Sequence, residues 1–236
     1  MLRFERKFRT STSDSASVAL RLKAMLPGLV EDYPDRVVHS LYFDDSASRH
    51  YQEHSDGAGE RSKFRIRWYR TENVNSIAAP IAPLFDLSRC SLVNFEAKLR
   101  IGSLISKSSQ VSESGLIGDL SRRFASPLCY ESLARKAGAS TTFPDLIAPV
   151  VFVSYVRRYL RFAGTQIRVT VDSSIRVGGF NPECVETIPL PGDPVIIETK
   201  CAPSDLTDVA RRLRSLPWPE VAFSKYMKAS RSVQAG

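Results

Sequence analysis

The sequence is poor in cysteine, and the cysteines that it has are widely spaced. The four residues are Cys90, Cys129, Cys184 and Cys201, and no two of them form a CxxC pair. A structural zinc site or a disulfide framework would need paired or clustered cysteines. Neither is predicted, and free thiols fit a reducing compartment.

Histidine is scarcer still, with only His39, His50 and His54. His50 and His54 are four residues apart, so a helix there would place them on one face as a possible metal pair. The surrounding stretch "SRHYQEHSDGAGE" is instead typical of a solvated loop. We therefore predict no histidine-based metal site.

Long hydrophobic runs are also missing. The longest nearly uncharged apolar stretch, "LIAPVVFVSYV" at 146–156, is too short to cross a bilayer, and the charged start "MLRFERKFR" has no apolar core of a signal peptide. A cytoplasmic protein without a transmembrane segment is expected.

The length and the charge set further limits. A chain of 236 residues fits one large domain, 1–236, better than two. Lysine and arginine number 33 against 25 acidic residues, which gives a net charge of +8. This excess favours an anionic partner such as a phosphate compound or a nucleic acid.

Alternating apolar and polar residues predict a mainly antiparallel β protein with attached helices. The expected strands cover residues 2–9, 37–45, 62–70, 92–100, 150–162, 165–177 and 194–200. Helices are expected after Asp14, ending at Pro27 and Gly28, and over 204–217. Helical spacing is also found from about 108 to 138, and the Pro-bearing stretch at 73–91 is predicted as a connecting loop.

One predicted strand, "RSKFRIRWYR" at 61–70, has cations on one face only. Arg61, Lys63, Arg65 and Arg67 alternate with apolar residues that include Trp68. Same-face neighbours lie about 6.6 Å apart, so each pair repels by roughly 2 kcal/mol in a partly buried site. Either this face is open to water or an anion binds to it.

Five further strands repeat this pattern, with charged or tyrosine residues two or four apart on the face opposite the apolar one. The pairs are Glu5 and Lys7, Glu96 and Lys98, Tyr155 and Arg157, Arg168 and Asp172, and Glu198 and Lys200. A single antiparallel sheet with one wet face would explain any one pair. Six such strands together indicate a closed sheet whose charged faces point inward and bind a polyanion, with carboxylates able to hold a divalent cation.

Eight short motifs in order resemble those of the VTC-type polyphosphate polymerase domain, within the triphosphate tunnel metalloenzyme (CYTH-like) superfamily. They are "FERKF", "YFDD", "KFRIRWY", "FEAK", "SYVRRY", "IRVTVD", "IIETK" and "FSKY", and the resemblance runs from residue 3 to about residue 228. It implies an α+β, mainly antiparallel fold, an eight-stranded tunnel barrel with helices packed outside. It also implies transfer of the γ-phosphoryl group of ATP to polyphosphate, with Mn²⁺ or Mg²⁺ as cofactor.

The resemblance also implies roles for individual residues. Substrate-binding residues would be Lys7, Lys63, Arg65, Arg67, Lys98, Tyr155, Arg157, Arg168, Lys200, Ser224 and Lys225. Of these, Arg65, Arg67 and Lys200 would serve catalysis together with Glu198, which would hold the metal, with Glu5 and Glu96 as further candidates. The cyclase and thiamine-triphosphatase branches begin with ExExK, whereas Arg3 stands here in place of the first acid. One acid fewer weakens binding of a second metal and favours a polymerase over a two-metal hydrolase.

Other functions stay open at this point. Water could replace the phosphate acceptor, which would make the protein a metal-dependent triphosphatase or polyphosphatase. A non-catalytic module that binds polyphosphate or inositol phosphates is a further alternative. Nucleic acid is disfavoured because the cations are scattered over separate strands and mixed with carboxylates, without an aromatic and basic platform.

Three more residues have alternative interpretations. Asp172 could orient an arginine or hold a metal, and the orienting role is preferred. Trp68 and Trp218 could stack on an adenine, but Trp68 alternates away from the cations and is expected to pack against the helices. Eukaryotic relatives carry an N-terminal phosphate-sensing module and a membrane-spanning tail, and this sequence is expected to hold the tunnel domain alone.

Overall fold

A computed structural model describes residues 3–10, 14–70, 92–101, 104–113, 147–181 and 186–234. Nine strands belong to one sheet: β1 (Phe4–Arg9), β2 (Leu29–Asp45), β3 (Glu60–Arg70), β4 (Leu92–Ile101), β5 (Leu104–Glu113), β6 (Ile147–Phe162), β7 (Arg168–Gly179), β8 (Ile188–Pro189) and β9 (Ile196–Cys201). The helices are α1 (Ser15–Met25), α2 (Arg49–Ser55), α5 (Leu206–Leu213) and α6 (Lys225–Gln234), with a 3₁₀ turn, η4 (Pro203–Asp205), before α5.

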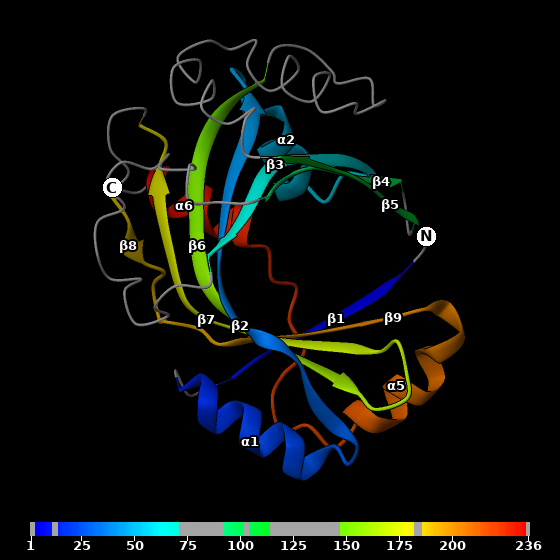
Figure 1. The fold of residues 1–236 in the computed structure, drawn as a ribbon. Coiled ribbons are helices and arrows are strands. Elements are labelled where there is room, and N and C mark those ends of the chain that lie inside the picture. Colours follow the sequence, from blue (N-terminus) through cyan, green and yellow to red (C-terminus); the bar gives the residue numbers. More distant parts are fainter. Residues whose placement is uncertain are drawn as a thin grey trace.

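The sheet is antiparallel throughout and follows the order β1-β9-β7-β6-β2-β3-β4-β5, with β8 paired to β7. It curls so strongly that β1 and β9 face β4 and β5 across its interior (Figure 1). An ion pair between Glu5 of β1 and Lys98 of β4 joins the two sides. The predicted fold class, a mainly antiparallel tunnel with helices, is confirmed. Within the described residues the sheet is a curled half-barrel and not the closed sheet that was expected, because its edge strands β1 and β5 do not pair with each other.

The two faces of the curled sheet differ in chemistry because successive side chains of a strand alternate between them. We call the face that carries Lys7, Arg67, Arg157, Asp172 and Glu198 the inner face. The neighbouring residues on the same strands, such as Phe8, Val171 and Ile197, belong to a buried apolar cluster on the outer face. The charged residues of these strands therefore lie on the inner face, and the outer face is apolar.

Helices α1 and α5 cover the outer face. Val18, Ala19 and Leu22 of α1 join Val209 and Leu213 of α5 in the outer apolar cluster. The Asp14 side chain caps α1 by accepting a hydrogen bond from the Ala16 backbone N–H at 2.9 Å, and the helix ends before Gly28, which has a φ of +85°. Both boundaries agree with those predicted from the sequence.

Helix α6 differs from the expectation that the helices pack outside. Phe223, Tyr226 and Ala229 share a second buried cluster with Val153 and Tyr155, which are inner-face residues of β6. That part of the inner face is apolar, so it needs a covering element to remove it from water. Helix α6 therefore lies inside the curl, with its N-terminal end beside the charged residues.

Two segments differ from their predicted structure. Residues 104–113 form β5, whereas helical spacing was expected from about 108; the rest of that stretch and the loop at 73–91 lie outside the described residues. Residues 49–55 form α2 instead of a solvated loop. The helix forms because Asp44, at the end of β2, accepts hydrogen bonds from the His50 and Tyr51 backbone N–H groups. No described helix is long and apolar enough to cross a membrane.

Candidate functional site

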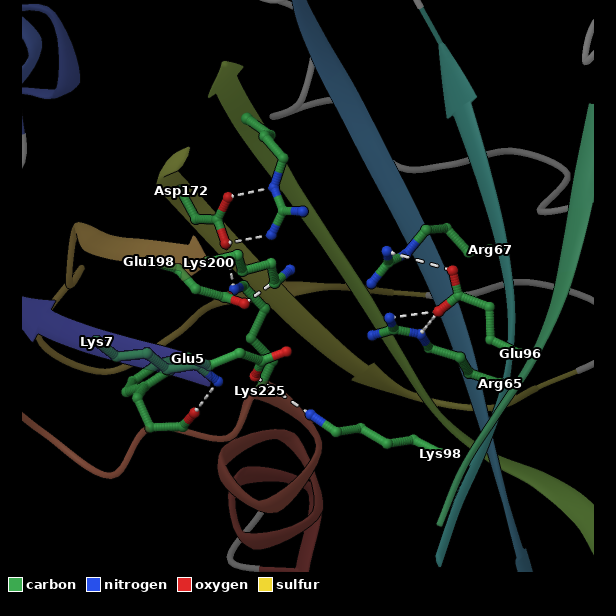
Figure 2. Close-up of polar contacts among 12 residues, drawn as sticks. Glu5, Lys7, Arg65, Arg67, Glu96, Lys98, Asp172, Glu198, Lys200 and Lys225 are labelled. Carbon is green, nitrogen blue, oxygen red and sulfur yellow. Dashed lines mark hydrogen bonds and ion pairs between the residues drawn. The ribbon is translucent and has the colours of Figure 1, made fainter. Parts of the chain in front are cut away.

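The charged residues of the inner face converge in one region. They come from six strands and from the start of α6, and Figure 2 shows their side chains pointing toward one another. Each faces inward because of its position in the alternation of its strand, and the strand register places it beside a charged residue of the next strand. Examples are Lys7 opposite Glu198, Asp172 opposite Arg157, and Arg65 opposite Glu96.

Glu96 holds two arginines of β3 (Figure 2). Its Oε2 accepts a hydrogen bond from Nε of Arg65 at 2.6 Å, and its Oε1 lies 3.5 Å from Nη1 of Arg67. The Tyr42 hydroxyl accepts from Nη1 of Arg65 at 3.0 Å. Burial would lower the pKa of Arg65, but Glu96 and Tyr42 raise it above its ordinary value. Both arginines are therefore fixed in charge and direction.

Asp172 holds a second pair of cations. It accepts two hydrogen bonds from Arg157, at 2.6 and 2.8 Å, and one from Nζ of Lys225. Burial would raise the pKa of Asp172, but Arg157 and Lys225 lower it to about 2. The Tyr155 ring lies 5.2 Å from the Arg157 guanidinium and 4.4 Å from Nζ of Lys225. Asp172 thus makes the contact expected of an arginine-orienting carboxylate.

The remaining acids, Glu5 and Glu198, lie on the neighbouring strands β1 and β9. Glu198 Oε1 is 2.8 Å from Nζ of Lys200, and Glu5 Oε2 is 3.2 Å from Nζ of Lys98. Burial would raise the pKa of Glu198, but Lys200 and Lys7 lower it well below its ordinary value. The two carboxylates are close enough for each to oppose ionisation of the other. Both nevertheless stay ionised, as metal ligands must be.

Glu5 and Glu198 alone are too few to hold a divalent cation, so a bound phosphate compound would have to supply further oxygens. Among the described residues there is no group of three acidic, histidine or cysteine side chains able to hold a metal. Mg²⁺ is usually held by one or two carboxylates together with waters and substrate phosphates. Glu5 and Glu198 provide that number, whereas Glu96 is already engaged by two arginines.

Lys63 and Lys7 contact the segment that leads into α6. Nζ of Lys63 donates to Oγ of Ser224 at 2.9 Å, and Nζ of Lys7 donates to the Phe223 carbonyl at 3.0 Å. Burial lowers the pKa of Lys63 to about 7, and nearby Lys7 and Lys98 lower it further in the same direction. Neither lysine has a carboxylate in these contacts, so both are available to an anion.

Arg168 is the predicted site residue that the structure places at the margin. It is the first residue of β7, its side chain is exposed, and it forms no ion pair with any residue that the structure describes. Its register partner is Lys200. Arg168 therefore extends the cationic face outward, without joining the central contacts.

Three buried polar atoms on the inner face have no hydrogen-bond partner within the described part of the chain: Nε of Arg67, Oγ of Ser40 and Oγ1 of Thr170. Ser40 lies opposite Arg67, and Thr170 lies opposite Glu198. Such atoms are costly to leave unpaired, and a polar ligand or a water molecule on the inner face would satisfy them. The sequence analysis missed Ser40, Thr170 and Tyr42, although their parity within their strands places each on the charged face.

The two tryptophans lie on the outer face, and the histidines form no metal site within the described residues. His50 is buried with Nδ1 2.9 Å from Oγ of Ser62, and burial lowers the pKa of His54 to about 3. Trp68 packs on the outer face against His39 and Phe152, with ring centroids 5.5 and 5.9 Å apart. Trp68 is a packing residue, as expected, but the rings that it meets belong to strands β2 and β6 and not to a helix.

Comparisons with known proteins agree with this description. The family model of the VTC domain matches residues 2–81, about a third of the chain. No curated protein matches the sequence.

Solved structures match along nearly the whole chain. An adenylyl cyclase-like protein of Hippeastrum, HpAC1, described as having a dominant triphosphatase activity, has a TM-score of 0.57 at 16% identity over 98% of this chain and 96% of its own. Adenylate cyclase-like proteins of Bacillus halodurans (TM-score 0.54, 14% identity, 94% of each chain) and Vibrio parahaemolyticus (0.53, 9%, 98% of each) are also similar. The chain therefore has the triphosphate tunnel (CYTH-like) fold, and its residues 2–81 match the family model of the VTC domain.

Proposed function

We propose that the protein binds the triphosphate of ATP on its inner face and transfers the γ-phosphoryl group to polyphosphate. The observation that carries this proposal is the convergence of cations from separate elements with few acids between them: Lys7, Lys63, Arg65, Arg67, Lys98, Arg157, Lys200 and Lys225. Phosphoryl transfer needs mainly positioning and charge stabilisation, so it requires no covalent nucleophile.

The acids of the site act chiefly on the cations. Glu96 directs Arg65 and Arg67, and Asp172 directs Arg157 and Lys225. An arginine whose direction is already fixed loses less conformational entropy when it binds phosphate oxygens. Nε of Arg67, which is buried and unpartnered within the described residues, would gain its missing hydrogen bond from the substrate.

Glu198 would hold the divalent cation, Mn²⁺ or Mg²⁺, with Glu5 as the second carboxylate. Together they would hold a metal ion whose positive charge stabilises the negative charge of the phosphoryl group during transfer. Lys200, 2.8 Å from Glu198, would keep that carboxylate ionised and would contact the same phosphate. We assign Glu96 to arginine orientation, because its two oxygens are used by Arg65 and Arg67.

A polymerase is preferred to a hydrolase for two reasons. The VTC-domain match covers β1 to β3, which carry four of the eight cations. Arg3 stands where two-metal relatives have an acid, so a second metal to activate water would have few ligands. The second candidate is a triphosphatase, and it is favoured by the fold similarity to HpAC1, whose described activity is of that kind.

The test is to incubate the purified protein with ATP and Mn²⁺ and to measure polyphosphate on a gel together with ADP and free phosphate. A ladder of polyphosphate with ADP in step is the expected result. Free phosphate without a ladder would replace the polymerase by the triphosphatase. If neither product forms while tripolyphosphate still binds, the protein is a polyanion-binding module.

A further inference from the structure

Three tyrosines surround one arginine beyond the charged region. The guanidinium of Arg36 lies 5.4 Å from the ring centroid of Tyr33, 5.9 Å from that of Tyr69 and 5.7 Å from that of Tyr159. Tyr33 and Tyr159 meet edge to face at 5.8 Å. We call these four residues the tyrosine cluster. It joins β2, β3 and β6.

A bulge in β2 makes this cluster possible. Tyr33 pairs with Tyr159, and Arg36 pairs with Arg157, so three steps along β2 match two steps along β6. In a regular strand, residues three apart point to opposite faces. The extra residue turns Tyr33 and Arg36 to the same face, and bulges of this kind commonly redirect side chains next to active sites.

An ion pair on the face opposite the tyrosine cluster stabilises the bulge. Asp35 accepts hydrogen bonds from Nε and Nη2 of Arg158 at 3.1 and 2.8 Å. Arg158 follows Arg157 directly, so its side chain leaves the opposite face of β6. Asp35, the acid next to Arg36 in the sequence, thus pairs with Arg158. Arg36 has no carboxylate partner within the ranges that the structure describes.

The tyrosine cluster continues the line of the phosphate-binding arginines. Tyr69 is two residues beyond Arg67 on β3, and Tyr159 is two residues beyond Arg157 on β6. Two residues of a strand span about 6.6 Å, roughly the distance between neighbouring groups of a nucleotide. A triphosphate gripped by Arg67 and Arg157 would therefore place whatever is attached to it at the tyrosines.

The chemistry of the tyrosine cluster suits an aromatic group and not more phosphate. Its rings have no positive charge of their own, and Tyr33 is 45% exposed, so part of this apolar surface faces solvent. Burial raises the pKa of Tyr159 to about 12, so its ring stays neutral near pH 7. A polyphosphate chain would require several further lysines or arginines, and the cluster provides Arg36 alone. Its three tyrosine rings and the Arg36 guanidinium plane can instead stack on a nucleobase.

We propose that the tyrosine cluster is the site for the base of a nucleoside triphosphate, with Tyr33 and Tyr159 as the stacking rings. The inference rests on the proposed function, since it assumes that a triphosphate binds between Arg67 and Arg157. Stacking tolerates every base, so the cluster distinguishes nucleoside triphosphates from inorganic tripolyphosphate and does not select adenine over guanine. It also sets the direction of ATP, with the base at this end and the γ-phosphate deeper inside.

The experiment compares two ligands on matched variants without metal. Calorimetric titrations with ATP and with tripolyphosphate are made on the wild type, Tyr33→Ala, Tyr159→Ala and Tyr33→Phe. Phe4→Ala is the control, because Phe4 is an equally exposed aromatic residue, at 46%, on the outer face of β1. We expect about tenfold weaker ATP binding in both alanine variants, with tripolyphosphate within about twofold, and no change in Tyr33→Phe or Phe4→Ala.

Each result has a definite meaning. Unchanged ATP affinity in both alanine variants overturns the inference. Equal losses for ATP and tripolyphosphate, with a lower melting temperature, would overturn it too, because the cluster would then be structural. If the wild type binds no tripolyphosphate, the proposed function fails instead. Saturation transfer from the protein to the adenine protons of AMP, present in the wild type and lost in Tyr33→Ala, would still support the nucleoside site in that case.

Discussion

Glu96 and Asp172 show how single carboxylates organise the inner face. Each is buried, and each contacts two cations at once. A buried ion pair contributes little net stability, because desolvation offsets most of the attraction. Its clearest effect here is geometric, since it points Arg65, Arg67 and Arg157 into a space where other cations repel them.

The β3 arginines should therefore control anion binding. Arg65→Ala and Arg67→Ala should each weaken tripolyphosphate binding about tenfold or more, because a charge-assisted contact contributes about 1.5–3 kcal/mol. Isothermal titration calorimetry on folded variants is the measurement. Arg211→Ala is the control, since that side chain is 78% exposed and pairs with Asp208, and it should change affinity by less than about twofold. Equal losses in the control would place binding outside the tunnel.

Glu198 separates binding from catalysis. Glu198→Gln removes one negative charge from a cationic site, so metal-free tripolyphosphate should bind at least as tightly as before. Metal-dependent turnover should fall by about a hundredfold or more if the ion supplies several kcal/mol of stabilisation. Both quantities are measured on one preparation, with Mn²⁺ for the assay. Turnover near the wild-type rate would remove Glu198 from the metal site, and a joint collapse would make it a structural partner of Lys200.

Lys63 predicts a pH dependence of binding. Burial lowers its pKa to about 7 in the free protein, so it is largely neutral at pH 8, and a bound polyanion should raise that pKa again. Binding at pH 8 then takes up a proton, and affinity falls as the pH rises above 7. Calorimetry at pH 8 in two buffers of different ionisation enthalpy measures the uptake. The number of protons taken up on binding should approach one in the wild type and should be near zero in Lys63→Met. A wild-type value near zero would contradict the prediction.

The segment from Phe223 to Tyr226 ties α6 to four different strands. Its contacts are Phe223 with Lys7 of β1, Ser224 with Lys63 of β3, Lys225 with Asp172 of β7, and Tyr226 with Asp44 of β2. Two of these partners are lysines, Lys7 and Lys63, which contact the segment through a carbonyl and a hydroxyl oxygen. The segment therefore couples the position of α6 to the cations that would bind phosphate.

The Tyr226–Asp44 hydrogen bond should contribute to stability. Asp44 is buried and also caps α2, so Tyr226→Phe removes a hydrogen bond from a carboxylate that stays buried. The free energy of unfolding should fall by about 1.5–3 kcal/mol. Urea denaturation measures it, with Tyr51→Phe as the control, because the Tyr51 hydroxyl accepts a hydrogen bond from the exposed Arg231 at 3.4 Å. A change below 0.5 kcal/mol, by the scale of ordinary surface substitutions, would show that the bond is not needed.

The secondary structure shows what local patterns can predict. The strands that carry the charge pattern and the helices α1 and α5 were predicted with boundaries within a few residues, because alternation, caps and glycine are local signals. Helix α2 was missed, since its cap comes from Asp44 on the preceding strand and its seven residues are too few for a periodic pattern. Strand β5 was missed because "LISKSSQVSE" is polar and is defined by its pairing with β4.

The protein as a whole has a net charge of +8, and many of these charges face one another in the tunnel. Such self-repulsion destabilises the folded chain until anions bind. Tripolyphosphate at a hundred times its dissociation constant should contribute about 2.7 kcal/mol, which corresponds to a melting temperature about 5–10 °C higher for a chain of this length.

Differential scanning fluorimetry measures that shift. Sodium chloride at matched ionic strength is the control for general screening, and Arg67→Ala should lose most of the tripolyphosphate effect. If sodium chloride raises the melting temperature as much as tripolyphosphate does, the stabilisation is not due to a specific site.

The sequence by itself determined which strands have a charged face, because side-chain alternation depends only on the local strand geometry. It also indicated the sign of the ligand, through Lys63, Arg65 and Arg67 on one face. Only the tertiary structure decided which charges meet: Glu5 reaches Lys98 because the sheet curls, and Asp172 selects Arg157 and Lys225. The tyrosine cluster depends on a β2 bulge that breaks the two-residue period. Curl, register and bulges arise from pairing between strands far apart in the chain, so no local pattern could predict them.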